Sequence, residues 1–267
     1  MNILVCVKQV PDINELKTDT ASNSLPIDKA PKIVNTLDAY ALETAVRLKD
    51  ADAATKIVVL TMGSESAKEA LKSALSVGAD KAYRVGDDAL ADSDTLATSY
   101  LLSSAAKTLE AREGLTFDLI LCGKQASDGD TAQVGSQLAE HLGYPQITSA
   151  LEISVADGKV RARRETGDGF EVVETALPAV VTISKTEYEP RYASVKTKMA
   201  ANRAEIPVLT VADLELDAAR IGLAGSPTKL RNTYVPQRKT GGVKLEEENG
   251  EIAAEKLATL LSDAGII

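Results

Sequence analysis

The sequence predicts an α/β protein in which helices cover both faces of a parallel sheet. Short apolar runs typical of buried strands alternate four times with segments whose apolar residues recur at helical spacing. After Pro145 apolar and polar residues alternate one by one, a pattern typical of antiparallel strands. Beyond about Glu205 both periodicities fade. These observations predict a parallel sheet with right-handed crossovers, added antiparallel strands and an extended C-terminal arm.

The elements of the predicted parallel sheet follow one another along the first half of the chain. Its strands are predicted at residues 3–7, 56–61, 81–85 and 118–122, and its helices at residues 38–50, 64–77, 94–112 and 134–142. The first helix has a clear apolar side, formed by Leu42, Ala45 and Val46. Ser64 is a candidate N-cap for the second. About thirty aperiodic residues after the first strand are expected to form a hairpin, cover a ligand or contact a partner.

The added strands are predicted at residues 148–155, 159–164, 170–175 and 179–184. Asp157 and Gly158 separate the first two and predict a tight hairpin turn. Arg161, Arg163 and Arg164 make a basic patch here. In an acidic chain such a patch is either a solvated strand face or a docking surface.

The predicted domain organisation is one α/β domain at residues 1–204, followed by a C-terminal arm at residues 205–267. Several apolar residues early in the arm have no obvious place in a completed α/β core: Val208, Leu209, Val211, Leu214 and Leu216. An amphipathic helix is predicted at residues 251–262. About sixty residues of this kind are expected to order against another chain, with a flexible tail as the alternative.

The composition argues against several functions. A net charge of −9 and an aromatic content of 3% without tryptophan disfavour a nucleic-acid binder. No apolar run approaches the roughly 18 residues of a membrane span, and the apolar start is too short for a signal peptide, so a cytoplasmic protein without membrane insertion is expected. Around the single histidine, His141, no catalytic or metal-binding set is predicted. Cys6 and Cys122 are expected to be buried reduced thiols, although neighbouring strands would also allow a disulfide.

A candidate ligand-binding loop joins the fourth predicted strand to its helix, in the sequence LILCGKQASDGDTAQVGSQ of residues 119–137. Asp130 and Gln133 have the spacing of an N-cap and its capping-box partner, which would leave free backbone N–H groups at residues 131–134. Such groups bind anions. The loop lacks the Walker and GxGxxG patterns, and Ala139 stands where a calcium loop needs glutamate. Spacing alone leaves two readings open, a phosphate site and an ordinary tight turn.

The position of this loop in the predicted sheet favours a ligand site. In open α/β sheets, ligands bind beyond the carboxyl ends of the strands, where the strand order reverses. That rule brings together the loops after Val7, Thr61 and Cys122. Met62 and Gly63 then form a second junction between a strand and a helix at the same edge.

The residue order in the loop closely resembles the nucleotide loop of the beta subunit of electron-transferring flavoproteins. The resemblance extends along nearly the whole chain through motifs in the same order, at residues 7–12, 41–43, 123–126, 128–135, 189–193 and 225–229. It implies a Rossmann-like parallel sheet of the adenine-nucleotide-binding type that electron-transferring flavoproteins share with universal stress proteins. It also implies an electron carrier, with no catalytic residues of its own, that oxidises NADH only as a complex with an alpha subunit.

The resemblance further implies which residues contact the nucleotide. They are Cys6, Asn35, Thr36, Leu37, Asp38, Met62, Ala126, Ser127, Asp128, Gly129, Asp130, Thr131, Ala132, Gln133, Val134, Gly135, Ser136 and Gln137. Two of them pose a difficulty, because the carboxylates of Asp128 and Asp130 would repel a diphosphate. We therefore expect these two side chains to cap backbone groups or bind ribose hydroxyls, and the phosphate to be held by N–H groups of residues 131–134.

Residues 185–203 resemble the recognition loop with which this family docks on dehydrogenases, and the implied docking residues are Arg191, Tyr192 and Val195. The implied partners are the alpha subunit, an acyl-CoA dehydrogenase-type or other flavin dehydrogenase, and ferredoxin or flavodoxin as a low-potential acceptor. An AMP- or ATP-binding signalling or stress protein is the alternative of another class. A stand-alone sensor would need neither the arm nor the docking segment.

The family contains two cofactor types, one with structural AMP in the beta subunit and one with a second FAD that NADH reduces. The second type splits the two electrons between a high- and a low-potential acceptor. The motifs at residues 8–12, 129–134 and 225–229 resemble this bifurcating type. Thr36-Leu37 and Ser127 depart from it, since the family has proline with an aromatic residue and an aliphatic residue at these places. FAD is therefore the expected cofactor, with AMP as the alternative.

Overall fold

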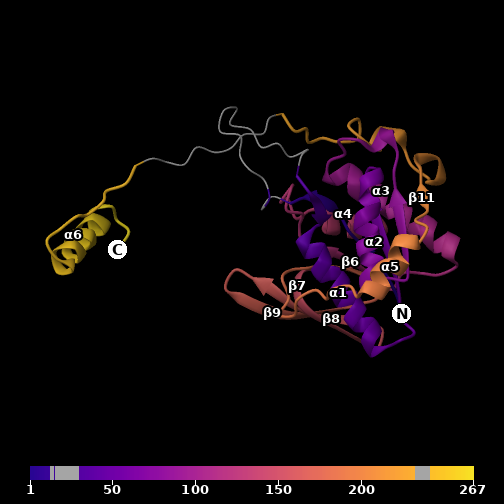
Figure 1. The fold of residues 1–267 in the computed structure, drawn as a ribbon, viewed down its shortest axis with the longest axis horizontal. Coiled ribbons are helices and arrows are strands. Elements are labelled where there is room, and N and C mark those ends of the chain that lie inside the picture. Colours follow the sequence, from indigo (N-terminus) through magenta and orange to yellow (C-terminus); the bar gives the residue numbers. More distant parts are fainter. Residues whose placement is uncertain (13–14, 16–29, 232–240) are drawn as a thin grey trace.

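The structure is a computed structural model that describes residues 1–12, 15, 30–231 and 241–267. Its main body is a nine-stranded sheet with helices on both faces (Figure 1). The strands lie in the order β11-β5-β4-β1-β6-β10-β7-β8-β9. They span β1 (Asn2–Cys6), β4 (Lys56–Met62), β5 (Lys81–Val85), β6 (Leu119–Gly123), β7 (Gln146–Ala156), β8 (Lys159–Thr166), β9 (Gly169–Ala176), β10 (Ala179–Ile183) and β11 (Val208–Leu209). The predicted α/β class is confirmed.

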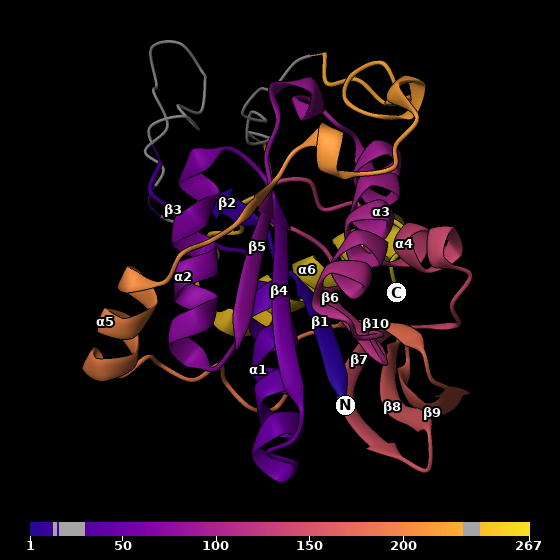
Figure 2. The same ribbon diagram turned by 90° about the vertical axis from the view of Figure 1, so that its right-hand side faces the viewer.

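The sheet divides the apolar core into two layers, and helices cover each of them. The helices are α1 (Thr36–Ala51), α2 (Lys68–Val77), α3 (Thr95–Glu113), α4 (Val134–Leu142), α5 (Val195–Arg203) and α6 (Gly250–Asp263). Apolar residues of α1 and α2 pack in one cluster, and those of α3 and α4 pack in the other. Figure 2 shows α2 and the α3–α4 pair on opposite sides of the central strands. The four predicted strand–helix units are therefore confirmed.

The central strands are buried on both sides, which explains their nearly continuous apolar sequences. β1 pairs with β4 and with β6, and both pairs are parallel. After the first strand, β2 (Gln9–Pro11) and β3 (Lys32–Val34) form a two-stranded antiparallel pair. This pair agrees with the hairpin expected there, although most of the intervening residues lie outside the described part of the chain.

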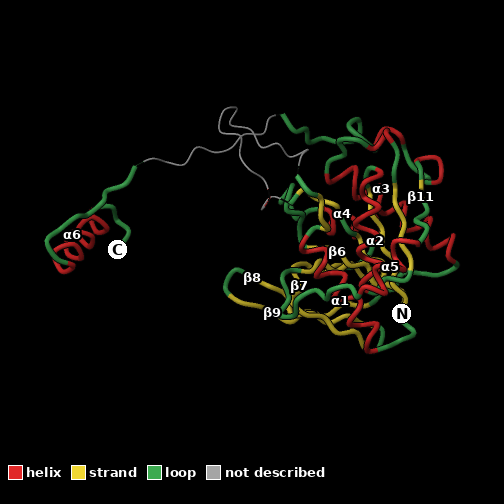
Figure 3. The backbone as a smooth tube through the Cα atoms, viewed as in Figure 1, coloured by secondary structure: helices red, strands yellow, loops and turns green. Residues whose placement is uncertain are grey.

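Strands β7, β8 and β9 are antiparallel, as the alternating pattern predicted, and their hairpin is visible at the lower left of Figure 3. Asp157 and Gly158 form the β7–β8 turn with positive φ values of 51° and 70°. β10 is different, because it lies parallel to both β6 and β7. The expectation that residues 179–184 belong to an antiparallel hairpin is thus wrong. All five residues of β10 are buried, and its continuous apolar run suits a parallel strand covered on both faces.

The segment after α5 also differs from expectation. β11 extends the sheet by pairing with β5, and Leu209, Leu214 and Ile221 are buried in the cluster beneath α3. The expectation that these residues have no place in the α/β core is therefore wrong for Leu209 and Leu214, which are buried in it, and for Val211 and Leu216, which pack against it. A two-residue strand and short 3₁₀ turns have no periodicity that sequence analysis can recognise.

Helix α6 confirms the helix predicted at residues 251–262. Asn249 caps it, since its Oδ1 accepts N–H bonds from Glu251 and Ile252 at 3.0 Å each. None of its residues is buried, and it lies apart from the sheet body in Figure 1. No helix within the described ranges is long and apolar enough to cross a membrane.

Candidate functional site

The strand order places a reversal point between β1 and β6. The chain leads from β1 outward through β4 to β5, and it then returns to the other side of β1 as β6. The helices that follow β1 and β6 consequently pack on opposite faces of the sheet. The loops after these two strands diverge at this point, and the region beyond the strand ends, here named the crevice between β1 and β6, is where α/β proteins of this topology bind ligands.

Asn35 connects the two loops that border this crevice. Its side chain is almost completely buried, with 1% exposed. Its Nδ2 donates a hydrogen bond to the Gln125 carbonyl at 2.9 Å, and its Oδ1 accepts one from the Ser127 N–H at 3.1 Å. Its own N–H donates to the carbonyl of Lys8 at 2.8 Å. Asn35 therefore fixes the course of the loop after β6 relative to the loop after β1.

Asp38 makes a second connection from the first turn of α1. Its Oδ2 accepts a hydrogen bond from the Lys8 N–H at 2.7 Å, and its Oδ1 accepts one from the Gly123 N–H at 3.1 Å. Burial raises the pKa of this carboxyl group from 3.8 to about 7, against the opposing effect of the hydrogen bonds that it accepts. Gly123 is required here, because an added Cβ would lie 2.4 Å from Asp38 Oδ1.

Helix α4 begins later than the sequence predicted. It starts at Val134 with Gln133 as the N-cap, and no side chain caps it. The predicted capping box of Asp130 and Gln133 is therefore wrong. Asp130 and Ala132 both adopt left-handed backbone conformations with φ of 54°, so the chain turns once more before the helix begins. The free N–H groups of the first turn lie at residues 134–136 instead of 131–134.

The side chains of the predicted capping box have other partners. The Asp130 carboxylate accepts a hydrogen bond from Gln125 Nε2. Gln133 Oε1 accepts one from Thr95 Oγ1 at 3.2 Å and so connects the loop to the start of α3. The expected capping of backbone groups by Asp130 is thus not observed, and its expected contact with ribose hydroxyls stays a prediction.

The predicted repulsion between Asp128 and a phosphate is reduced by an ion pair that sequence analysis did not predict. Lys8 Nζ lies 2.7 Å from Asp128 Oδ2, and both side chains are partly exposed, at 50% and 28%. The pair bridges the loops after β1 and β6 and neutralises the charge of Asp128. Gly129 beside it has open space around a virtual Cβ, so any need for glycine there would come from a ligand.

The structure brings most of the predicted nucleotide-binding residues to this crevice. Cys6 ends β1 opposite Cys122 in β6, and both cysteines are free and buried, as expected. Thr36 and Leu37 begin α1, and Val134, Gly135, Ser136 and Gln137 form the first turn of α4. The loop residues Ala126, Ser127, Thr131 and Ala132 lie between them, mostly exposed. Met62 lies farther along the same edge, at the end of β4.

Arg84 holds the loop after β4, and sequence analysis did not single it out. Its Nη1 donates to the carbonyl of Gly63 at 2.8 Å, and its Nη2 lies 3.1 Å from Glu65 Oε2. Ser64 precedes a 3₁₀ turn at Glu65–Ala67 that leads into α2, but its side chain makes no capping bond. The predicted side-chain cap is therefore absent, and a buried arginine from β5 orders the junction instead.

The motif at residues 225–229 lies against the start of α3. Asp94 caps that helix by accepting N–H bonds from Leu96 and Ala97 at 2.9 and 3.1 Å. The Asp94 N–H donates to Ser226 Oγ at 2.8 Å, and Thr228 N–H donates to Asp94 Oδ2 at 2.9 Å. The next residue, Thr95, donates to Gln133 in the loop before α4. The motif therefore contacts α3 at Asp94, directly beside the residue through which α3 contacts that loop.

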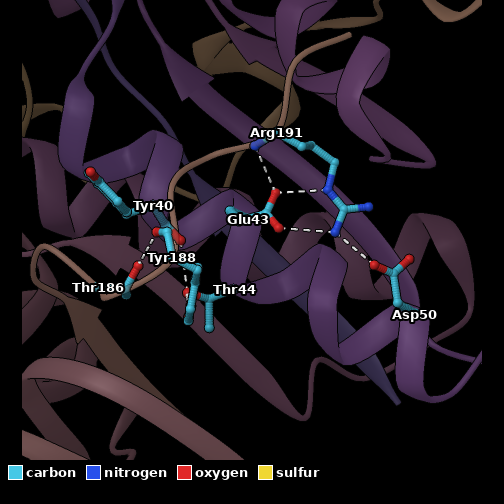
Figure 4. Close-up of polar contacts among 7 residues, drawn as sticks. All are labelled: Tyr40, Glu43, Thr44, Asp50, Thr186, Tyr188 and Arg191. Atoms are coloured by element: carbon cyan, nitrogen blue, oxygen red, sulfur yellow. Dashed lines mark hydrogen bonds and ion pairs between the residues drawn. The ribbon is translucent and has the colours of Figure 1, made fainter. Parts of the chain in front are cut away.

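The predicted docking segment is fixed to α1 by a group of polar contacts (Figure 4). Arg191 Nε donates to Glu43 Oε2 at 2.8 Å, and Nη2 donates to Glu43 Oε1 at 3.0 Å and to Asp50 at 2.7 Å. Tyr40 and Thr44 of α1 add hydrogen bonds to Glu189 and Tyr188, each at 2.7 Å. Arg191 thus has internal partners.

Tyr192 and Val195 are exposed, at 98% and 79%, beside this anchored group. Ser194 caps α5, because its Oγ accepts the Thr197 N–H at 3.1 Å. Ala201 on the inner side of α5 is buried, while Met199 is half exposed. The exposed apolar side chains of this segment are therefore held on a rigid support.

The strand order and the loop–helix junctions at its reversal point define a doubly wound α/β protein, a class that binds ligands beyond the strand ends at such a point. A family model described as "Electron transfer flavoprotein domain" matches residues 27–214. The chain belongs to the electron transfer flavoprotein family.

Its relatives include proteins that it matches along their whole length. It is 46% identical over 270 residues to the electron transfer flavoprotein subunit beta of Megasphaera elsdenii, with 100% of both chains covered. It is 39% identical to the corresponding subunit of Thermoanaerobacterium thermosaccharolyticum and to the caffeyl-CoA reductase-Etf complex subunit CarD of Acetobacterium woodii, again with 100% of each chain covered. The identification as an electron transfer flavoprotein beta subunit is thus confirmed.

Proposed function

We propose that this beta subunit binds FAD in the crevice between β1 and β6 and, together with an alpha subunit, passes electrons from NADH to two acceptors. The observation that carries the proposal is the pair of buried side chains, Asn35 and Asp38, which join the loops on either side of the crevice. Buried polar groups at a strand end are costly unless they are satisfied, and here they fix loop geometry instead of filling a core.

The phosphate groups of the nucleotide would be held at the N-terminus of α4. Its first-turn N–H groups, at residues 134–136, have no partner within the helix and carry the positive end of its dipole. Two left-handed residues, Asp130 and Ala132, shape the approach to that helix. Strained backbone of this kind is retained mainly where it serves a site. When bound, FAD would supply the hydride and single-electron chemistry, which the side chains of this chain lack.

Polar partners of two acidic groups make the crevice more compatible with an anionic ligand. Lys8 offsets the charge of Asp128 through contacts with both of its carboxylate oxygens, and Asp130 Oδ1 accepts from Gln125. The other oxygen of Asp130 would be available to a ribose hydroxyl. Structural AMP, the alternative cofactor, would use the same phosphate and ribose contacts. The resemblance to the bifurcating type at residues 8–12 and 225–229 favours FAD.

The partner chains are proposed from the exposed apolar surfaces. Helix α6 exposes the apolar side chains of Ile252, Leu257 and Leu260, and no other part of the described structure buries them. A helix of this kind is stabilised by packing against another chain. We propose that residues 205–267 form the arm that holds the alpha subunit, with α6 as its distal contact and residues 208–221 as its attachment to the α/β body.

Residues 185–203 are proposed as the surface that docks on a dehydrogenase, of the acyl-CoA or another flavin-dependent type. One relative is named as a subunit of a caffeyl-CoA reductase-Etf complex, which supports a reductase partner of this kind. Tyr192 and Val195 would make the contact, while Arg191 fixes the segment to α1. Ferredoxin or flavodoxin is the proposed low-potential acceptor.

The cofactor is tested by the nucleotides that the purified complex of this chain with its alpha subunit releases. We expect two FAD per heterodimer and no AMP, and we expect NADH to bleach the beta-bound flavin under anaerobic conditions. One FAD with one AMP would reject bifurcation. Two FAD without reduction by NADH would keep the site and require another electron donor.

Replacing Val195 with aspartate should weaken docking on the dehydrogenase by about 2 kcal/mol, because a charge would replace an apolar contact that loses water on binding. The measurement is the rate of electron exchange between the heterodimer and the dehydrogenase. Val172→Asp is the matched control, since Val172 is also exposed, at 52%, but lies on β9. Equal exchange rates for both variants would place docking elsewhere. The nucleotide content should be unchanged in both.

A further inference from the structure

We propose that Asp38 binds a proton when an anionic nucleotide enters the crevice between β1 and β6, so that nucleotide binding is linked to proton uptake. This inference rests on the proposed nucleotide site. It assigns to Asp38 a positioning role that responds to charge, in place of a direct contact with the ligand.

The first observation is that Asp38 is a buried carboxyl group without a cation. Only 7% of the residue is exposed. Among the described residues, its hydrogen-bond partners are the N–H groups of Lys8 and Gly123 and the side chain of Asn35, and no ion pair includes it. The ammonium group of Lys8 lies against Asp128, at 2.7 Å, and acts on Asp38 only through its charge. A buried carboxylate that is held by N–H and amide groups without a cation in contact is easily neutralised when its surroundings become more negative.

The second observation concerns the resting protonation of this group. Burial raises its pKa to about 7, so both protonation states are populated near neutral pH. A negative charge nearby favours the neutral form of a carboxyl group and would raise this pKa further. A nucleotide phosphate at the N-terminus of α4 would supply that charge. The first turn of α4 packs on the end of β6, since a Cβ at Gly135 would lie 3.7 Å from Cys122 Cβ, and the next residue, Gly123, donates its N–H to Asp38.

The other charged or titratable groups around Asp38 already have hydrogen-bond or ion-pair partners of their own. A hydrogen bond that the Cys122 thiol donates to Cys6, burial and the charge of Asp38 raise the pKa of Cys122 well above its ordinary value, so that thiol stays protonated. Just after β6, Lys124 pairs with Glu165 at 3.1 Å. Farther along α1, Tyr40 donates to Glu189 and Glu43 pairs with Arg191. Asp38 is thus the group at the strand ends whose protonation would follow the charge in the crevice.

The geometry explains why a proton at this place matters for binding. Oδ1 and Oδ2 of Asp38 accept from different loops, one after β6 and one after β1. Both loops also depend on the neighbouring Asn35. Neutralising Asp38 removes its repulsion of the ligand and leaves the amide contacts of Asn35 in place.

The test is calorimetric titration of FAD into the heterodimer after its nucleotides have been removed, at about pH 8, in two buffers that differ in ionisation enthalpy. The difference in heat gives the number of protons taken up. We expect wild type to take up about half a proton more per beta site than Asp38→Asn. Subtracting the variant removes the protons exchanged by FAD itself and by the alpha subunit. Equal proton uptake in the two proteins would overturn the inference.

Two further measurements cover a variant that fails to fold and a site that fails to bind. In wild type and in Cys122→Ser alike, the dissociation constant should fall about threefold for each unit that the pH decreases between about 9 and 7. A constant independent of pH would overturn the proton linkage while keeping the nucleotide site. The absence of any nucleotide binding by the heterodimer would instead reject the proposed function, and the inference with it.

Discussion

Gly123→Ala is expected to destabilise the α/β body by about 3 kcal/mol and to empty the nucleotide crevice. The new Cβ would lie 2.4 Å from Asp38 Oδ1 and 2.8 Å from both the Asp38 N and the Leu37 carbonyl carbon. Two of these atoms belong to the backbone, so rotation of a side chain cannot relieve the contact. The first turn of α1 would have to move away from β6, and Asn35 and Asp38 would lose their hydrogen bonds across the crevice.

Gly129→Ala is the control for Gly123→Ala, because it adds the same methyl group to the same loop. No atom lies within 4 Å of a Cβ at Gly129, and its φ is not positive. Its effect on stability should therefore be within about 0.5 kcal/mol. Denaturant unfolding of the heterodimer compares the two variants, and the nucleotide content is measured for Gly123→Ala alone, because Gly129 is itself a predicted nucleotide contact. Similar stabilities for the two variants would show that α1 and β6 do not approach as closely as described.

Arg191→Ala is expected to cost about 2 kcal/mol of folding stability and to release the docking segment from α1. Only 5% of the Glu43 side chain is exposed, so removing Arg191 would leave a buried carboxylate without its cation. The arginine side chain itself is 35% exposed, which is why the expected cost is below that of a fully buried pair. Denaturant unfolding measures the stability, and limited proteolysis within residues 185–203 measures the release.

Two variants separate this ion pair from other effects. Tyr192→Ala removes a side chain that is 98% exposed and should leave both stability and protease resistance unchanged. Glu43→Gln in the Arg191→Ala background should restore part of the lost stability, because a neutral amide is cheaper to bury than a carboxylate. No recovery in the double variant would show that Arg191 acts through packing of its aliphatic chain and not through charge.

The contact between Arg191 and Asp50 predicts how the stability of the fold depends on pH. Hydrogen bonding to Arg191 is the main cause that lowers the pKa of Asp50 below its ordinary 3.8. The contribution of this contact is therefore present above the unfolded-state pKa and is lost as the pH falls through the lowered one. Asp38 behaves in the opposite way. Its raised pKa costs stability as the pH rises from about 4 to about 7.

The sequence predicted the parallel part of the fold because long, strongly patterned elements dominate it. Strands such as residues 56–61 and 118–122 are continuous apolar runs, and helix 38–50 has a clear buried side. It also identified the loop before α4, since a glycine-bearing connection between strand and helix is visible in sequence. The crevice residues Asn35 and Asp38 came from family resemblance, because a buried polar residue in an N-terminal helical turn has no local signature.

What the sequence missed depends on contacts between residues far apart in the chain. Lys8 pairs with Asp128 across 120 positions, and Arg84 reaches the carbonyl of Gly63 from the next strand. The start of α4 was misplaced, since Asp130 has the spacing of an N-cap but uses its side chain on Gln125. β11 is only two residues long, so its place in the sheet follows from pairing with β5 and not from propensity.

Helix α1 contributes residues both to the proposed cofactor site and to the support of the proposed docking segment. The first turn of α1 carries Asp38 at the crevice, and its middle and last turns carry Glu43 and Asp50, which hold the docking segment. Asp50 comes twelve positions after Asp38, so at a rise of 1.5 Å per residue the two lie about 18 Å apart along the helix axis. The helix thus fixes the distance between the proposed cofactor site and the surface that is proposed to contact the next protein. Docking cannot change that spacing without breaking the Arg191 contacts or moving the crevice itself.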